Sequence, residues 1–235
     1  MNLFKFDSEA AWVDGIASFW RDRLRRNSKL RMCLPSGHTP NAIYAEMGKA
    51  VAAGQVSFKH AEIFALDEFG GLAPDDEGLC ANMLQRYLLK HIDLPPLNFH
   101  RIEPNKKNVA REYDELIGDG FDLSLLGVGL NGHLGMNEPG SPIDGTTRRV
   151  ELHPSTVASS AKYLTHANLP TWGVAVGLKH LLGSKEVWVL ANGSKKAEII
   201  QGAAKGPVGP DVPASLLRNH PKAFFMVDAE AGAMV

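Results

Sequence analysis

The sequence predicts an α/β fold in which helices flank a doubly wound, mostly parallel β-sheet of Rossmann-like type. Short apolar segments of strand length alternate along the chain with amphipathic segments of helix length. Four of the apolar segments run directly into polar loops, as is typical of the carboxyl ends of parallel strands. Because no linker, internal repeat or low-complexity tract interrupts this alternation, we expect residues 1–235 to form a single domain.

The first half of the chain contains the clearest helix signals. Trp12, Ile16 and Trp20 recur at helical spacing, which predicts a helix that packs on the core. Thr39 followed by Pro40 is typical of a helix start, with Thr39 as the cap. The elements expected in this half are helices at 8–26, 40–53, 79–91 and 108–117 and strands at 30–34 and 62–66.

The second half begins with an apolar segment that breaks into a glycine-rich loop. Residues 142–154 are expected to be a loop, whereas residues 174–182 fit either a strand or a helix. The other elements expected are strands at 121–128, 186–190 and 223–227 and helices at 155–164, 192–204 and 212–219.

The polar loops predict where a ligand binds. Parallel strands end at one edge of the sheet, and ligands of such folds bind in the crevice beyond that edge. We therefore expect four loops to converge there, at 36–39, 67–68, 131–138 and 193–196.

Composition argues against several classes of partner. The hydrophobic and charged fractions, 44% and 22%, are ordinary for a globular protein, and the formal net charge of −1 gives no reason to expect binding to nucleic acid or a membrane surface. No apolar run approaches the roughly 18 residues of a membrane span, and no signal-peptide pattern is seen, so we expect a cytoplasmic protein. Cys33 and Cys80 lie apart in apolar segments and are expected to be buried, reduced thiols.

Two predicted helix starts could bind an anion. Ser36, Gly37, His38 and Thr39 combine backbone amides with two hydroxyl groups, and a helix N-terminus favours a phosphate. Lys196 places a positive charge at the start of another helix. Taken alone, each feature is more often a helix cap or a solvated lysine, and no Walker motif is present.

Candidates for proton transfer follow two other strands. Asp67 is a candidate general base, although a helix cap or an ion pair is the plainer interpretation. His133 and Glu138 could form a pair in which the carboxylate orients the imidazole. A metal site competes, but no HxxH or HExxH spacing supplies further ligands, and GxGxxG and GxSxG motifs are absent. The residues indicate an enzyme for a small phosphorylated substrate, without metal or cofactor.

Three sequence blocks resemble the glucosamine-6-phosphate deaminase/isomerase family, which shares a superfamily with 6-phosphogluconolactonase. They are Leu66-Asp67-Glu68-Phe69, the Gly-Val-Gly-Leu-Asn-Gly-His run at 127–133, and Asn-Glu-Pro-Gly at 137–140. The likeness extends over nearly the whole chain. Because the lactonase branch usually reads toward Phe-Pro after Gly-His, the chain looks like the deaminase branch.

Within that branch, the Asn-Gly-His-Leu-Gly form at 131–135 looks more like galactosamine-6-phosphate deaminase/isomerase proteins, since the glucosamine enzymes usually have Asp where this chain has Asn131. The resemblance therefore implies conversion of galactosamine 6-phosphate to tagatose 6-phosphate plus ammonia, a hydrolysis of a C–N bond coupled to aldose–ketose isomerisation. The alternative is conversion of glucosamine 6-phosphate to fructose 6-phosphate plus ammonia.

The resemblance also implies roles for individual residues. Asp67 would move a proton between C2 and C1 of the open-chain sugar. His133 would assist ring opening, with Glu138 orienting it and Asn131 beside them in the catalytic loop. Residues 36–39 and Lys196 match the family's phosphate-binding positions.

Four features depart from the family pattern. Asn131 cannot carry a charge, and His38 stands where relatives often have a second glycine, so it would be strained if its φ were positive. A phosphate-binding arginine is missing, its nearest match being Ala161 with Lys162 beside it. Of the positions that bind an allosteric activator in regulated relatives, only Arg148 is retained, so no such activation is expected.

Two further functions remain open at this point. One is a 6-phosphogluconolactonase, and the other is a sugar-phosphate-binding regulatory protein that has lost catalysis. In each case the expected partner is a small sugar phosphate, without nucleic acid or membrane, and a homo-oligomer is left open.

Overall fold

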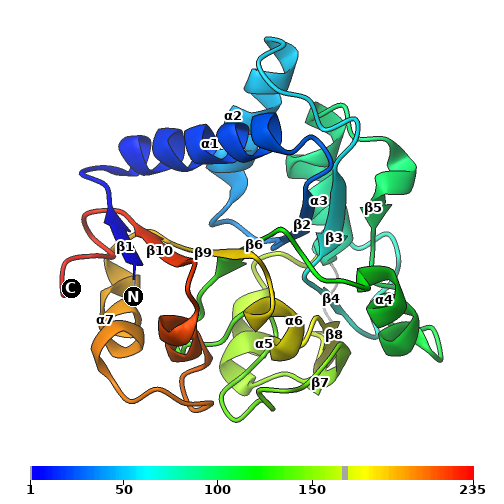
Figure 1. The fold of residues 1–235 in the computed structure, drawn as a ribbon. Helices are drawn as coiled ribbons and strands as arrows, with labels where there is room; N and C mark the ends of the chain where they lie inside the picture. Colours follow the sequence, from blue (N-terminus) through cyan, green and yellow to red (C-terminus); the bar gives the residue numbers. More distant parts are fainter. Residues whose placement is uncertain (1, 166–168) are drawn as a thin grey trace.

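The computed structural model, which describes residues 2–165 and 169–235, is built on a seven-stranded sheet (Figure 1). The strand order is β1-β10-β9-β6-β2-β3-β5, and all neighbouring strands are parallel. The predicted α/β fold with a mostly parallel, doubly wound sheet is therefore confirmed. The strands are β1 (Asn2–Lys5), β2 (Arg31–Leu34), β3 (Glu62–Ala65), β5 (Phe99–His100), β6 (Leu123–Gly127), β9 (Glu186–Ala191) and β10 (Ala223–Val227).

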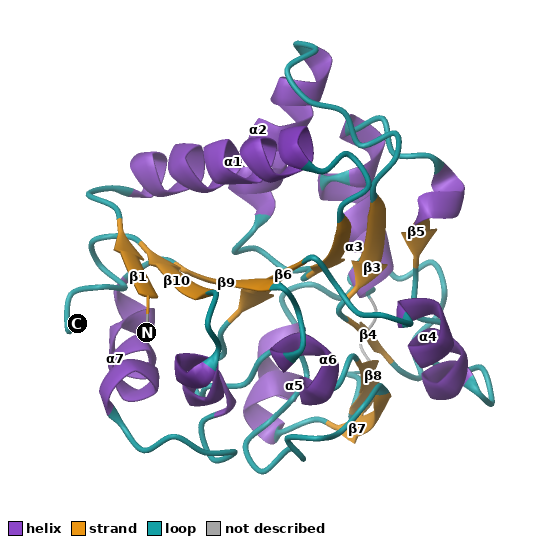
Figure 2. Ribbon diagram, viewed as in Figure 1, coloured by secondary structure: helices purple, strands orange, loops and turns teal. Residues whose placement is uncertain are grey.

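Helices cover both faces of this sheet (Figure 2). Helices α1 and α2 lie over one face, and α6 and α7 lie under the other. The α-helices are α1 (Glu9–Arg26), α2 (Asn41–Ala52), α3 (Cys80–Tyr87), α4 (Val109–Ile117), α5 (Pro154–Ser160), α6 (Leu178–Leu182) and α7 (Ala197–Lys205). Short 3-10 helices are η1 (Leu89–His91), η2 (Pro96–Asn98), η3 (Ser194–Lys196) and η4 (Pro213–Asn219).

Helix α1 shows how the sequence pattern produces the core. Ser8 caps its start by accepting a hydrogen bond from the amide of Ala11 over 3.1 Å. Trp12, Ile16 and Trp20, the predicted stripe, are completely buried against the sheet. Removing each such side chain from water contributes about 1.5–3 kcal/mol, which outweighs the small helix propensity of the aromatic residues.

A second, antiparallel sheet was not predicted. It has the order β4-β8-β7, with β4 at Asp67–Phe69, β7 at Arg148–Glu151 and β8 at Trp172–Ala175. The prediction of loops at 67–68 and 142–154 is therefore wrong in part. These strands are only three or four residues long, and their pairing partners are distant in sequence, so no local alternation marks them.

Several helix predictions also need correction. Pro40, not Thr39, occupies the cap position of α2, and no side chain caps that helix. The helix expected at 79–91 is divided into α3 and η1, and the helix expected at 212–219 is the 3-10 helix η4 (Pro213–Asn219). The ambiguous 174–182 segment contains the end of β8 followed by α6.

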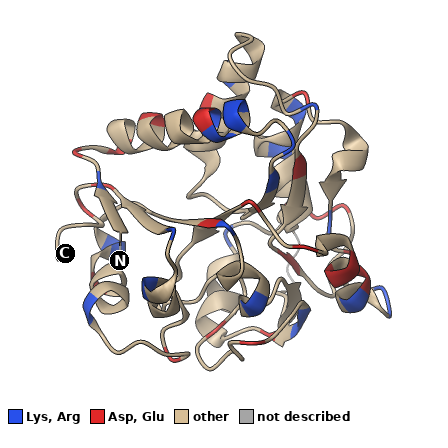
Figure 3. Ribbon diagram, viewed as in Figure 1, with Lys and Arg blue, Asp and Glu red and all other residues tan. Residues whose placement is uncertain are grey.

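The state of the cysteines, the character of the helices and the distribution of charge can also be compared with the predictions. Cys33 and Cys80 are both buried and unpaired, as predicted. Within the described residues, none of the helices combines the length and apolar character that a membrane crossing requires. Acidic and basic residues are interspersed over the fold rather than gathered on one face (Figure 3). The single domain and the cytoplasmic location stay predictions.

Candidate active site

A cavity of about 470 Å³ lies beyond the carboxyl ends of β2 and β6. Its lining comes from the segments after β2, β3 and β6, from α5 and the residues that follow it, and from η3. The four polar loops therefore converge as expected. The lining includes every predicted site residue except Glu138: Ser36, Gly37, His38, Thr39, Asp67, Asn131, His133 and Lys196.

Asp67 is one of the residues that line this cavity. It begins β4, where it pairs with Ala175, and it is 8% exposed. Burial raises the pKa of Asp67 to about 6, and a hydrogen bond from the Cys80 thiol and the charge of nearby His133 offset this only in part. A carboxylate that gains and loses a proton close to neutral pH is suited to act as a general base.

The neighbouring Glu68 has a structural role that sequence reasoning missed. Its buried carboxylate accepts hydrogen bonds from the amides of Phe69, Cys80 and Ala81 over 2.8–2.9 Å. Burial raises the pKa of Glu68 to about 7, although these amides stabilise the ionised form. The carboxylate thereby attaches the start of α3 to β4 and fixes the backbone beside Asp67.

The glycine-rich loop after β6 folds back on itself. The amide of Gly129 donates to the carbonyl of His133 over 3.0 Å, and Val128 pairs with Leu134. A Cβ atom at Gly129 would lie 2.2 Å from the His133 ring. Gly129 therefore leaves the space that the imidazole occupies.

Glu138 lies behind His133 and connects three side chains. Asn131 donates to its Oε2 over 2.8 Å, and Thr156 donates to its Oε1 over 2.5 Å. Oε2 is also 3.3 Å from Nδ1 of His133, without the alignment of a hydrogen bond. Burial opposes ionisation of Glu138, but His133, Thr156 and Asn131 together lower its pKa to about 2. Glu138 is therefore expected to be ionised beside the imidazole at neutral pH.

Asn137, by contrast, belongs to the framework. It is completely buried, and its Nδ2 donates to the carbonyls of Leu134 and Val176. Its Oδ1 accepts a 2.8 Å hydrogen bond from Arg148. This amide attaches the loop to the segment after β8, and Arg148 is engaged inside the protein.

The part of the lining formed by residues 36–39 and Lys196 is suited to an anion. Gly37 has φ +89°, whereas no described residue other than glycine has a positive φ, so His38 does not meet the condition under which it would be strained. Lys196 donates to the carbonyl of Val128 over 2.6 Å. Burial lowers the pKa of Lys196, and the charge of Lys162 lowers it further.

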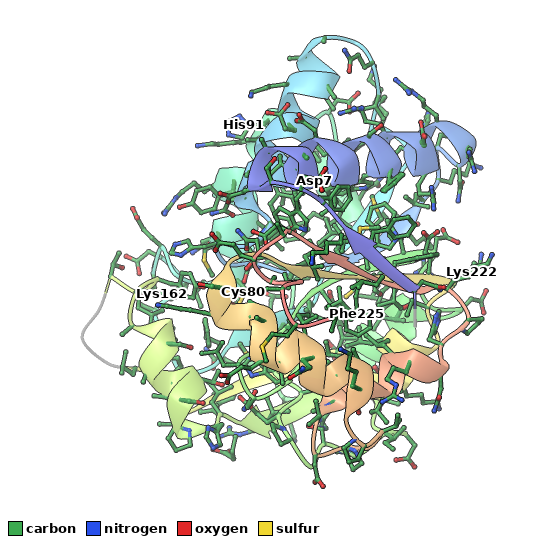
Figure 4. All side chains as sticks on the ribbon, turned by 90° about the vertical axis from the view of Figure 1, so that its left-hand side faces the viewer. Asp7, Cys80, His91, Lys162, Lys222 and Phe225 are labelled. Carbon is green, nitrogen blue, oxygen red and sulfur yellow. The ribbon has the colours of Figure 1, made fainter. Side chains whose placement is uncertain are left out.

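Lys162 and Thr156 are lining residues that sequence reasoning did not assign. Figure 4 labels Lys162 and Cys80, two of the residues that line the cavity. The sequence signal for Lys162 and Thr156 was the segment 155–160, which is rich in hydroxyl side chains and has Lys162 shortly after it. Such a segment is too polar for a core helix.

Comparisons with known proteins agree with this geometry. Residues 7–226 match the family model of glucosamine-6-phosphate isomerases/6-phosphogluconolactonase. A glucosamine-6-phosphate deaminase of Bacillus pumilus is 34% identical over 240 residues, covering 100% of both chains. Glucosamine-6-phosphate deaminase 2 of Bacillus subtilis is 32% identical over 223 residues, covering 92% of this chain and 90% of the relative.

Solved structures show the same fold. A monomeric glucosamine-6-phosphate deaminase superposes with a TM-score of 0.95 at 26% identity, covering 100% of both chains. The 6-phosphogluconolactonase of Trypanosoma brucei superposes with a TM-score of 0.78 at 18% identity, covering 99% of this chain and 97% of that one, which is a likeness of fold alone. The chain therefore belongs to the glucosamine-6-phosphate isomerase/6-phosphogluconolactonase family.

Proposed function

We propose that the protein converts glucosamine 6-phosphate and water to fructose 6-phosphate and ammonia. The observation that supports this most directly is the shared cavity of Asp67 and His133, with Lys162 and Lys196 also in its lining. A base, an imidazole and two cations are what proton transfer within a sugar phosphate requires.

The reaction divides into steps that these groups can assist. His133 moves a proton from the anomeric hydroxyl to the ring oxygen, which opens the ring. Asp67 removes the proton from C2, which gives an enolamine as the C1 oxygen gains a proton, and then returns its proton to C1. The amine loses a proton at this point, so that the aldose becomes an imine at C2. Water then adds to this carbon and ammonia leaves, which yields the ketose. Glu138 keeps a negative charge beside the imidazole while the ring opens.

The choice of sugar follows the relatives. The relatives from Bacillus pumilus and Bacillus subtilis have the name glucosamine-6-phosphate deaminase, which favours the glucosamine alternative over the galactosamine expectation. Asn131 is the observation that keeps galactosamine 6-phosphate as the second candidate. Its amide donates to Glu138 where an aspartate would repel that carboxylate.

An ammonia-release assay on the two sugar 6-phosphates tests the proposal. We expect turnover of both to depend on Asp67, with the higher kcat/KM for glucosamine 6-phosphate. Asp67→Asn should be inactive, whereas Asp75→Asn, an exposed aspartate of the same segment, should match the wild type. A higher kcat/KM for the galactosamine compound would reverse the choice of sugar.

Two outcomes would replace the proposed class altogether. Hydrolysis of 6-phosphogluconolactone without ammonia release from either amino sugar would indicate a lactonase. Binding of the sugar phosphates without any turnover, unchanged by Asp67→Asn, would indicate a regulatory binding protein.

A further inference from the structure

Glu138 is held from two separate parts of the chain. Nδ2 of Asn131 donates to Oε2 from within the 128–138 loop, over 2.8 Å. Oγ1 of Thr156 donates to Oε1 from helix α5, over 2.5 Å. Each carboxylate oxygen therefore has its own donor, and Thr156 supplies one from outside the loop.

The orientation of this carboxylate decides how Glu138 meets His133. Nδ1 of His133 is buried and forms no hydrogen bond within the described residues, although Oε2 of Glu138 lies 3.3 Å away. The side chains of His133 and Glu138 are only 21% and 13% exposed, respectively, so water screens their interaction poorly. A small rotation of the carboxylate would align the pair or separate it, and the bond from Thr156 restricts that rotation.

Thr156 also belongs to the wall of the cavity. It lines the cavity together with Ser159, Lys162 and Tyr163 from the same stretch of chain. A sugar phosphate in the cavity would therefore contact the segment that holds Glu138. Thr156 therefore connects the cavity wall that would contact the substrate with the pair formed by His133 and Glu138.

We propose that Thr156 is a positioning residue for ring opening, which acts through Glu138 on His133. The inference rests on the proposed function, because ring opening is a step of that reaction. Thr156 itself transfers no proton. Its hydroxyl keeps the Glu138 carboxylate turned so that Oε2 faces Nδ1 of His133.

Thr156→Val tests this directly, since valine keeps the shape of the side chain and removes the hydroxyl. We expect kcat for glucosamine 6-phosphate to fall about 10- to 100-fold, the range of a lost hydrogen bond to a charged group, with little change in KM. Thr156→Ser keeps the donor and should restore most of the rate. Ser184→Ala removes a buried hydroxyl that pairs with Ser124, and it should leave kcat unchanged.

A double-mutant cycle separates positioning from a merely structural role. If Thr156 acts through His133, adding Thr156→Val to His133→Gln should cost no further activity. If the losses in activity caused by the two substitutions multiply in the double variant, the inference is overturned. A Thr156→Ser variant that is as slow as Thr156→Val would also overturn it. Should the valine variant not fold, Thr156→Ala removes the same hydroxyl without the branched side chain.

The two proposals can fail separately. A wild-type protein that releases ammonia from neither amino-sugar phosphate defeats the proposed function, and this inference falls with it. A wild-type protein that turns over glucosamine 6-phosphate, with Thr156→Val equally fast, defeats the inference alone.

Discussion

Gly135 lies directly against the carboxylate of Asp67: a Cβ atom at Gly135 would be 3.0 Å from Oδ2. Gly135 also has φ +59°, which favours glycine. The loop after β6 therefore crosses the start of β4 with no side chain between them. This close approach brings His133, from that loop, into the same cavity as Asp67, although they are distant in sequence.

The first prediction concerns the pH dependence of turnover. Asp67 must be ionised to accept the C2 proton, and its pKa is raised to about 6 by burial. We expect kcat/KM to fall as the pH drops below about 6, and Asp67→Asn to lose roughly 10²–10⁴-fold or more at every pH. Initial rates between about pH 3.5 and 9 check this. An acid limb in the wild type that lies near pH 4 would show that Asp67 is not the group titrating.

The second prediction is that the same substitution stabilises the protein. The folded-state pKa of Asp67 lies above its value in the unfolded chain, so the folded state holds the extra proton between about pH 4 and pH 6, and stability falls as the pH rises through this window. Asp67→Asn should therefore raise the free energy of unfolding at pH 8 by about 1–3 kcal/mol. Urea denaturation at pH 8 and pH 4 measures it, and the gain should shrink at pH 4. An equal or larger gain at pH 4 would contradict the linkage.

The third prediction concerns His133. His133→Gln removes the proton carrier and keeps a polar side chain of similar reach. We expect it to slow turnover of the closed-ring substrate about 10²-fold, while open-chain substrate analogues react at nearly the wild-type rate. Parallel kinetics with the two kinds of substrate measure the difference. Equal losses for both would exclude a role in ring opening.

Much of the main sheet could be predicted from local signals. The stripe of Trp12, Ile16 and Trp20 and the apolar segment before the glycine-rich loop each identify their element from neighbouring residues alone. The edge strand β5 is two residues long, and β1 is largely exposed, so neither has an apolar segment to reveal it. Their strand structure follows from pairing with β3 and β10.

Candidate site residues could be predicted where the residue type and its position after a strand indicate a chemical role. Asp67, His133 and the loop at 36–39 were identified because polar residues follow apolar strands. Glu68 and Thr156 could not be assigned, because their roles depend on partners 12 and 18 residues away whose positions only the folded chain defines. Glu68 in particular becomes a framework residue only because three backbone amides converge on it.

The fourth prediction tests the space beside the imidazole. In Gly129→Ala, the new Cβ atom would lie 2.2 Å from the His133 ring, so the ring must move. The φ of Gly129 is not positive, and the variant should fold with a loss of about 1–3 kcal/mol from overpacking. We expect kcat to fall at least as much as in His133→Gln. Gly202→Ala, on α7 with no atom near the added Cβ, is the matched control and should keep full activity.

The fifth prediction concerns the two lysines of the cavity. Lys162 is exposed, and its positive charge adds to the effect of burial in lowering the pKa of Lys196. A phosphate bound between them would remove this repulsion. Lys162→Met should therefore raise KM for glucosamine 6-phosphate about 10-fold and leave kcat nearly unchanged, because the phosphate is held equally in the ground and transition states.

Lys196→Met should raise KM more, since it also removes the hydrogen bond to the carbonyl of Val128 at the start of the glycine-rich loop. Competitive inhibition by inorganic phosphate gives a second measurement, and its Ki should rise in parallel with KM in both variants. Lys205→Met, at the far end of α7, is the control for loss of a lysine. If Lys162→Met lowered kcat at constant KM, Lys162 would act on the transition state. Another residue would then have to replace the phosphate-binding arginine that this chain lacks.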